Sequence, residues 1–314
     1  MANAYTVGTR GSALALAQTA IVMEELLHRI GGLDLARQIV RTSGDQNLEV
    51  PLAAVGSEGV FVKELEHALL AGEIDLAVHS LKDLPTESDP RLSLAAILPR
   101  ADSRDALIAP GRHGLAELPD GAILGTGSLR RRAQLARINP TWRFKDIRGN
   151  LDTRLSKLRA GDYDALILAC AGLDRLGRTP VISERLSYSA VLPAPGQGAI
   201  AVQIRSGDSV LAEILGLLDD PASHTAVAAE RSLLAAVGGG CLVPLGAHAE
   251  LQGDQIILDA VLASEDGSQI VRGRMEGPGA KPRELGAALG ADLLARGGEA
   301  ILAQLRLAEP GKRF

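Results

Sequence analysis

The 314-residue sequence has little cysteine, few aromatic residues and no long apolar run. Its two cysteines, Cys170 and Cys241, cannot form a disulfide framework or a cysteine-rich metal site. No apolar stretch of about 18 residues or more occurs, so we expect no membrane-spanning helix and no membrane partner. The first residues lack the basic and apolar regions of a secretory signal, which favours a cytoplasmic protein.

The charge balance excludes a further class of function. With 33 basic and 38 acidic residues the net charge is −5, which argues against a chain that coats nucleic acid with its whole surface. The six histidines show no metal-ligand spacing, so we expect no metal site. Nothing in the sequence suggests an obligate interface, and we expect a monomer. At roughly 150 residues per domain, the length predicts two or three domains.

The chain contains a repeated pattern of strand, glycine turn, serine N-cap and helix. The first copy covers residues 8–14 and the second covers residues 125–129, a separation of 125 − 8 = 117 residues. Short apolar runs alternate with helical patterns around both copies, which is typical of parallel sheets with helices on both faces. The sequence therefore predicts two similar doubly wound α/β domains, on the plan of periplasmic binding proteins.

Breaks in composition suggest where these domains begin and end. Residues 192–198 are too rich in proline and glycine for a regular element, and an alanine-rich helix followed by alternating strands begins after Pro221. We expect the last part to be a small α+β domain. The expected boundaries are residues 1–98 with 199–217 for the first domain, 104–192 for the second, 220–314 for the third, and hinges at 99–103 and 193–198.

Basic residues are concentrated between Arg130 and Arg159. That window holds ten basic and two acidic residues, a net charge of +8. Arg130 and Arg131 lie in the first turn of a predicted helix, where the helix dipole disfavours cations, so we expect an anion near Ser128. Arg148 and Arg154 also flank turns, and several arginine forks suit a ligand with several carboxylates or phosphates. We interpret four others as a solvated surface: Arg137, Arg143, Lys157 and Arg159.

Polar residues follow a buried strand at Ile74–Val78. Lys82 and Asp83 stand just beyond its carboxyl end, where open α/β sheets bind ligands. A salt bridge within the loop would explain the pair equally well. The functional interpretation is that Asp83 stabilises a positive charge that develops only in a transition state.

The two cysteines have different contexts. Cys170 lies in an apolar run and is predicted to be a packed core thiol. Cys241 follows three glycines, which let the backbone approach another group closely, so Cys241 is either a covalent tether or an incidental buried thiol. Nucleotide binding is disfavoured, since the glycine turn at residues 125–128 lacks a third glycine and no phosphate-binding loop motif occurs. Trp142 and Phe144 are the only aromatic residues in the sequence between Arg130 and Arg159, which disfavours binding of single-stranded RNA.

Six motifs together resemble one family, in order and in spacing, over nearly the whole chain. They are residues 8–12 (GTRGS), 79–85 (HSLKDLP), 125–131 (GTGSLRR), 148–154 (RGNLDTR), 192–198 (LPAPGQG) and 239–244 (GGCLVP). The family is porphobilinogen deaminase, also called hydroxymethylbilane synthase. The resemblance implies a three-domain transferase that joins four porphobilinogen molecules head to tail, releases ammonia each time, and yields hydroxymethylbilane.

The resemblance also implies roles for particular residues. A dipyrromethane cofactor would be attached to Cys241, and Asp83 would be catalytic, assisting loss of the amino group and stabilising a cationic azafulvene. The implied cofactor-binding residues are Ser80, Lys82, Ser128, Arg130 and Arg131. The implied substrate-binding residues are Arg10, Ser12, Phe61, Arg148, Arg154 and Arg175.

The sequence departs from the family pattern at a few positions. Ala54 and Glu58 stand in a loop where other members carry lysines, so this loop is expected to handle substrate carboxylates differently. Leu242 replaces a glutamine common after the cofactor cysteine. Two other functions remain open from the residues alone: a two-lobed anion-binding protein without catalysis, and an RNA-binding module that uses the basic window.

Overall fold

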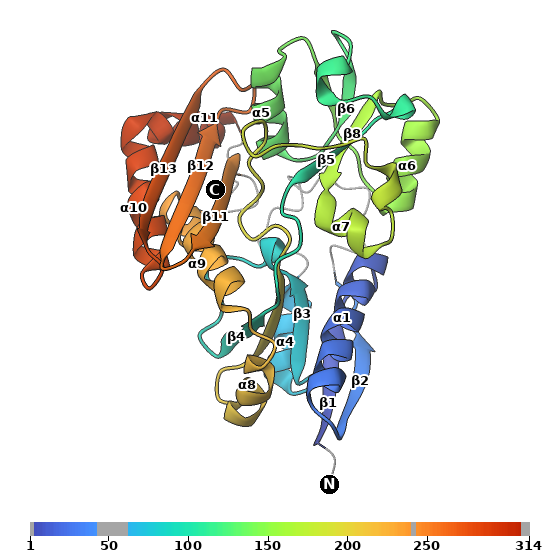
Figure 1. The fold of residues 1–314 in the computed structure, drawn as a ribbon, viewed down its shortest axis with the longest axis vertical. Coiled ribbons are helices and arrows are strands. Elements are labelled where there is room, and N and C mark those ends of the chain that lie inside the picture. Colours follow the sequence, from blue (N-terminus) through green and yellow to red (C-terminus); the bar gives the residue numbers. More distant parts are fainter. Residues whose placement is uncertain (1–2, 43–61, 240–242, 309–314) are drawn as a thin grey trace.

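The structure is a computed structural model that describes residues 3–42, 62–239 and 243–308. It contains three sheets, two of five strands and one of three. Figure 1 shows the first α/β unit at the bottom, the second at the upper right and the C-terminal unit at the left. No helix in the described part of the chain is long and apolar enough to cross a membrane.

The first unit is a five-stranded sheet with strand order β2-β1-β3-β10-β4. Its strands are β1 (Asn3–Thr9), β2 (Leu33–Ile39), β3 (Leu76–Ser80), β4 (Leu92–Ile97) and β10 (Ile200–Arg205). Its helices are α1 (Ala13–Arg29), α4 (Lys63–Ala71) and α8 (Ser209–Gly216). Ser12 caps α1 by accepting a hydrogen bond from the Ala15 amide, which satisfies one of the free donors of the first turn.

The second unit repeats this plan with strand order β7-β6-β8-β5-β9. Its strands are β5 (Asp105–Ile108), β6 (Ile123–Gly125), β7 (Arg143–Lys145), β8 (Ala165–Ala169) and β9 (Glu184–Arg185). Its helices are α5 (Leu129–Ile138), α6 (Leu151–Arg159) and α7 (Cys170–Arg175). Ser128 caps α5 as Ser12 caps α1, by accepting from the Arg131 amide. The predicted repeat of two doubly wound α/β units is confirmed.

Both five-stranded sheets are mixed rather than wholly parallel. In the first unit, β10 runs antiparallel to both β3 and β4, and in the second, β5 runs antiparallel to β8 and β9. Each of these strands is the first one formed after the chain crosses from the other unit. A strand that arrives from a different unit needs no helical crossover within its own sheet, so it is free to insert in the antiparallel direction.

The C-terminal unit is an antiparallel sheet covered by helices, as predicted. Its strands are β11 (Leu245–Gln252), β12 (Gln255–Ala263) and β13 (Ile270–Pro278), and its helices are α9 (Pro221–Ala236), α10 (Pro282–Leu293) and α11 (Glu299–Ala308). Leu233, Leu258 and Leu289 are buried in the core between sheet and helices. Each such side chain contributes about 1.5–3 kcal/mol of transfer free energy.

One buried carboxylate joins both crossing segments to the C-terminal unit. Glu230, on α9, forms an ion pair with Arg100 at 2.7 Å and accepts hydrogen bonds from the amides of Gly196 and Ala249, each at 2.7 Å. The Nε of Arg100 donates to the carbonyl of Gln197 at 2.9 Å. The three units therefore meet at a shared, fully paired acid.

Candidate functional site

A small cavity lies at the carboxyl ends of β1 and β3, where the sequence predicts a ligand site. Its volume is about 50 Å³, and Asp83 lies in its wall. The other polar residues that line it are Arg10, Ser12, Gln18, His79 and Ser80. Arg10 and Ser12 from the motif at residues 8–12 are thus brought together with Ser80 and Asp83 from the motif at residues 79–85.

Asp83 is placed by a short turn rather than by a long element. Leu81–Asp83 form a single 3-10 turn directly after β3, closed by the hydrogen bond from the Leu84 amide to the Leu81 carbonyl at 3.1 Å. In the part of the chain that the structure describes, no donor hydrogen-bonds the Asp83 carboxylate. Its charge is therefore available to a ligand in the cavity.

The side chains next to Asp83 in the cavity wall, unlike Asp83 itself, are held by other groups of the protein or are uncharged. Gln18 on α1 donates from Nε2 to the Ser80 hydroxyl at 2.9 Å, and Ser80 donates to Gln18 Oε1 at 3.0 Å. Burial lowers the pKa of His79 to about 4, so its imidazole is neutral near pH 7. These side chains form an uncharged wall beside Arg10 and Asp83.

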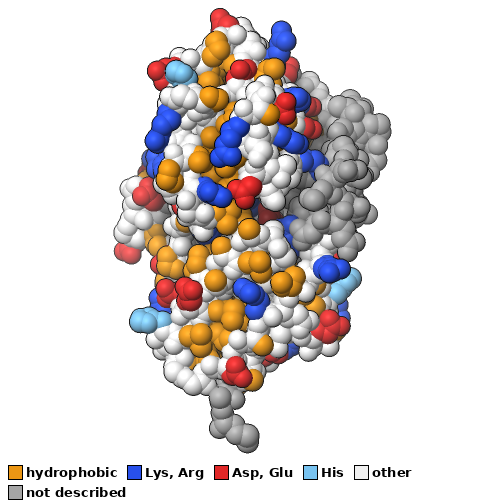
Figure 2. All heavy atoms as spheres, turned by 90° about the vertical axis from the view of Figure 1, so that its right-hand side faces the viewer, with side chains coloured by type: hydrophobic (Ala, Val, Ile, Leu, Met, Phe, Trp, Pro, Cys, Tyr) orange, Lys and Arg blue, Asp and Glu red, His pale blue; other side chains and the backbone are white. Residues whose placement is uncertain are grey.

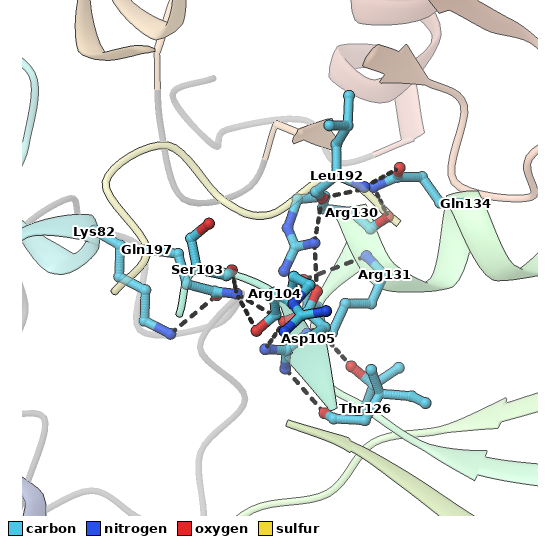
Figure 3. A network of polar contacts seen from close by, with 12 residues as sticks. Lys82, Ser103, Arg104, Asp105, Thr126, Arg130, Arg131, Gln134, Leu192 and Gln197 are labelled. Atoms are coloured by element: carbon cyan, nitrogen blue, oxygen red, sulfur yellow. Dashed lines mark hydrogen bonds and ion pairs between the residues drawn. The ribbon is translucent and has the colours of Figure 1, made fainter. Parts of the chain in front are cut away.

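The second unit carries a buried ion cluster that sequence reasoning missed (Figure 3). Asp105, the first residue of β5, is fully buried and pairs with Arg130 and Arg131, each at 2.7 Å. Arg130 also donates to the carbonyl of Leu192 at 2.6 Å, and Arg131 donates to that of Ile167 at 3.0 Å. The carboxylate that offsets two arginines at the start of α5 is thus the protein's own.

The electrostatics of this cluster leave a net positive charge. Burial alone would raise the pKa of Asp105, but the Arg130 and Arg131 charges outweigh it and hold that pKa well below its ordinary range. Two arginines share this one carboxylate, and the buried Nε of Arg131 has no hydrogen-bond partner among the described residues. A signal for Asp105 existed in the sequence: an acid stands directly before the apolar run Ala106–Ile108 that forms a buried strand.

Lys82 and Gln197 connect the two units across the site. Lys82 Nζ donates to Gln197 Oε1 at 3.4 Å, and Gln197 Nε2 donates to Asp105 Oδ1 and to the Ser103 carbonyl, each at 2.8 Å. Burial lowers the pKa of Lys82, the neighbouring Asp83 opposes that shift, and the Arg131 charge adds to it. Lys82 therefore belongs to the same electrostatic environment as the arginines of the second unit.

The remaining predicted arginines lie in two places. Burial lowers the pKa of Arg154, and the neighbouring charges of Arg131 and Arg148 lower it further, so these three cations form one group. Arg154 Nε donates to the Gly149 carbonyl at 2.9 Å. Arg175 donates instead to the carbonyl of Gly198 on the crossing segment at 2.7 Å, and burial lowers its pKa to about 10.

Some predicted residues lie outside the described part of the chain. These are Phe61 and Cys241, together with the departures at Ala54, Glu58 and Leu242. Cys170 is described, and the prediction of a packed core thiol is confirmed because its side chain is fully buried in a hydrophobic cluster of the second unit. That burial raises the pKa of Cys170 to about 12.

Two observations bear on the other functions considered for the basic window. Trp142 is buried and donates from Nε1 to the Pro119 carbonyl, so it offers no stacking surface to a nucleobase. On the face presented in Figure 2, basic and acidic side chains are interspersed rather than separated by sign.

Among residues 3–42, 62–239 and 243–308, no group of three potential metal ligands occurs.

Comparison with known proteins agrees with the resemblance read from the motifs. Residues 5–213 match the model described as "Porphobilinogen deaminase, dipyromethane cofactor binding domain", and residues 224–295 match "Porphobilinogen deaminase, C-terminal domain". The porphobilinogen deaminase of Roseiflexus castenholzii is 49% identical over 303 residues, covering 96% of this chain and 100% of the relative. That of Thermus thermophilus is 46% identical over 301 residues, covering 96% of this chain and 98% of the relative.

Proposed function

The chain belongs to the porphobilinogen deaminase family, and on that premise we propose how its own residues carry the reaction. The family is a transferase of tetrapyrrole biosynthesis that acts on porphobilinogen, and this chain has the domain that binds its dipyrromethane cofactor. The observation that carries the proposal is the open carboxylate of Asp83 in a cavity beside a group of cations. No observation favours a two-lobed binding protein without catalysis.

The residues of the site fit a cofactor that carries several carboxylates. Lys82, Arg130, Arg131, Arg148 and Arg154 bring five positive charges to a region that also holds two acids, Asp83 and Asp105. The buried Nε of Arg131 has no partner in the part of the chain that the structure describes, and it is a donor that a ligand oxygen would satisfy. When bound, dipyrromethane supplies the terminal pyrrole to which substrate rings are added.

We assign the cofactor's contacts from this fit and from the family motifs. Cys241 is proposed as the attachment point. The groups proposed to hold the cofactor carboxylates are Ser80, Lys82, Ser128, Arg130 and Arg131. Arginine forks bind carboxylates through two parallel hydrogen bonds, which fixes the orientation of each ring as well as its position.

Asp83 is proposed as the catalytic residue. Loss of ammonia from porphobilinogen leaves positive charge on the substrate pyrrole, and a nearby carboxylate that accepts no hydrogen bond from the described residues stabilises that charge as it forms. The proposed substrate contacts are Arg10, Ser12, Phe61, Arg148, Arg154 and Arg175. Arg10 and Ser12 share the cavity with Asp83, so a ring carboxylate bound there would bring the aminomethyl group close to the catalytic oxygen.

The mass of the freshly purified protein tests the assignment of the tether. We expect the intact mass to exceed the sequence mass by two pyrrole units, and Cys241→Ala to remove the excess together with activity. Cys170→Ala is the matched control and should keep the adduct, because the Cys170 thiol is buried. An active protein without added mass contradicts the tether.

The proposal also covers the oligomeric state, the cellular location and the hinges, which are all expected from the sequence. We propose that the protein is a monomer in the cytoplasm and that residues 99–103 and 193–198 act as hinges between the α/β units. Light scattering coupled to size-exclusion chromatography tests the first, since a mass of twice 32.7 kDa would contradict it. Scattering profiles with and without porphobilinogen test the hinges.

A further inference from the structure

Arg231, in the C-terminal unit, reaches across to the loop that follows Asp83. Its Nη1 donates to the carbonyl of Leu84 at 3.2 Å, and its Nη2 donates to the carbonyls of Pro85 at 2.7 Å and Thr86 at 3.5 Å. Three successive carbonyls of that loop therefore converge on one guanidinium. Hydrogen bonds from a charged donor are about twice as strong as those between neutral groups.

The guanidinium of Arg231 is not balanced by any acid in the described part of the chain. No carboxylate of the described residues forms an ion pair with Arg231, whereas Arg100 on the crossing segment has Glu230. Burial lowers the pKa of Arg231, and the nearby charge of Arg283 lowers it further. The carbonyl dipoles of the loop are thus the main compensation for a partly buried cation, which ties the loop and the helix to each other.

A second contact joins the same loop to the chain just before Cys241. A Cβ at Gly239 would lie 3.1 Å from the Thr86 hydroxyl and 3.0 Å from the Leu234 carbonyl, so only glycine fits there without displacement. Gly239 is two residues before Cys241, and between Arg231 and Gly239 the chain consists of the end of α9 and a turn at Gly238 with φ of 85°. One helix end therefore holds the Asp83 loop and leads directly to the proposed tether.

We propose that Arg231 is a positioning residue that fixes the Asp83 loop against the end of α9, from which the chain leads in sequence to Cys241; this rests on the proposed roles of Asp83 and Cys241. In the proposed reaction, the pyrrole chain is attached to the protein at one residue, and the Asp83 carboxylate must be held close to the reacting ring. A misplacement of about 1 Å can cost roughly 100-fold in rate. A cavity of about 520 Å³, lined by Arg231, Arg283 and Thr86 among others, lies beside the loop and gives it room to move when the guanidinium is removed.

The first test compares Arg231→Met and Arg231→Lys with Arg283→Met in the full-length protein. Arg283 lines the same cavity, and among the described residues its side chain forms no hydrogen bond to the loop, so its replacement is the matched control. We expect Arg231→Met to lower kcat roughly 10- to 100-fold with KM within about two-fold, and Arg231→Lys to recover part of the loss. The mass of the covalent adduct should stay unchanged in all three variants.

Hydrogen exchange gives a readout that does not depend on turnover. Peptides that cover residues 84–88 should exchange faster in Arg231→Met than in the unmodified protein, and Arg283→Met should leave them unchanged. Unchanged exchange in those peptides overturns the proposal, as does an equal loss of activity in the Arg283 variant.

A double-mutant cycle with Asp83→Asn separates positioning from general structural damage. If Arg231 acts through Asp83, Arg231→Met should change the residual turnover of the Asp83→Asn protein by less than about two-fold. Independent, multiplying losses overturn the positioning role while leaving Asp83 catalytic. Full turnover of Asp83→Asn alone would instead show that the proposed function of Asp83 is wrong, and Arg231 would then have nothing to position.

Discussion

The two α/β units have the same strand order and the same serine-capped first helix, yet they treat their functional acids in opposite ways. In the second unit, Asp105 receives hydrogen bonds from Arg130, Arg131 and Gln197. In the first unit, Asp83 receives none from the described residues. Asp105, which is hydrogen-bonded by the protein's own side chains, stabilises the fold. Asp83 has no such bond from the described residues, so its carboxylate can interact with a ligand.

The comparison also separates two uses of arginine. Arg130 and Arg131 are buried and partly committed to Asp105, so their positions are fixed before any ligand arrives. Fixed cations cost no reorganisation when they meet an anion, which is the basis of electrostatic preorganisation. The second unit therefore acts as a rigid electrostatic support, and the first unit supplies the group that acts on the substrate.

Asp83→Asn gives the largest expected effect. The amide keeps the shape but not the charge, so we expect kcat to fall on the order of 1,000-fold, as for loss of a transition-state electrostatic contact. The melting temperature should barely change, since no hydrogen bond of the described residues is lost. Steady-state kinetics and calorimetry check both parts, and a large drop in melting temperature would mean that Asp83 is structural, like Asp105.

Asp105→Asn should chiefly reduce stability. Two buried arginines would lose their counter-charge, which typically costs about 3–5 kcal/mol of unfolding free energy, measurable by urea titration. Because the folded-state pKa of Asp105 is depressed, its contribution is present above the ordinary aspartate pKa and is lost as the pH falls below about 4 toward the folded value. In the Asp105→Asn variant, the unfolding free energy should therefore fall less steeply between about pH 4 and lower pH than it does in the unmodified protein. The same steepness in both proteins would contradict this explanation.

Arg148→Ala should have an intermediate effect, on chain growth. Loss of one charge-assisted contact of about 1.5 kcal/mol or more corresponds to roughly a ten-fold loss of turnover. We expect the masses of the covalent adducts to shift toward intermediate chain lengths. Arg137→Ala, an exposed position in the same basic window, is the control and should leave the mass distribution unaltered. Arg130→Ala should show the same shift with an added loss of stability, because Arg130 also pairs with Asp105.

Cys170→Ala should have the smallest effect. The thiol is fully buried in the core of the second unit and its pKa is raised to about 12, so it should resist iodoacetamide in the folded protein. Removing one buried sulfur should cost about 1 kcal/mol in unfolding free energy and leave kcat unchanged. Rapid alkylation of Cys170 under native conditions would contradict this.

Much of the architecture could be predicted because the sequence repeats it. Glycine turns and serine caps at residues 8–12 and 125–128 locate both α/β units, and the alternating strands after residue 245 locate the antiparallel sheet. The motif at residues 79–85 places Asp83 at a strand end, which the structure confirms.

The partners of the arginines could not be predicted in the same way. Asp105 lies 25 positions before Arg130, and Gln197 lies 92 positions after Asp105, so only the folded chain brings them together. An acid at the edge of an apolar run looks like a surface residue until the sheet that buries it is known. The antiparallel insertion of β5 and β10 was missed for a related reason, because strand direction depends on where the chain crosses between units.

The position of β10 inside the first sheet, between β3 and β4, has a consequence for how the chain folds as it is made on the ribosome. β10 (Ile200–Arg205) fills the space between β3 and β4, whereas every strand of the second sheet lies between Asp105 and Arg185. The second sheet is thus complete in the nascent polypeptide while the first still has a gap between two of its strands. Although synthesis begins at the amino terminus, we expect the middle of the chain to acquire its native sheet first, and the N-terminal half to wait for residues made about 100 positions later.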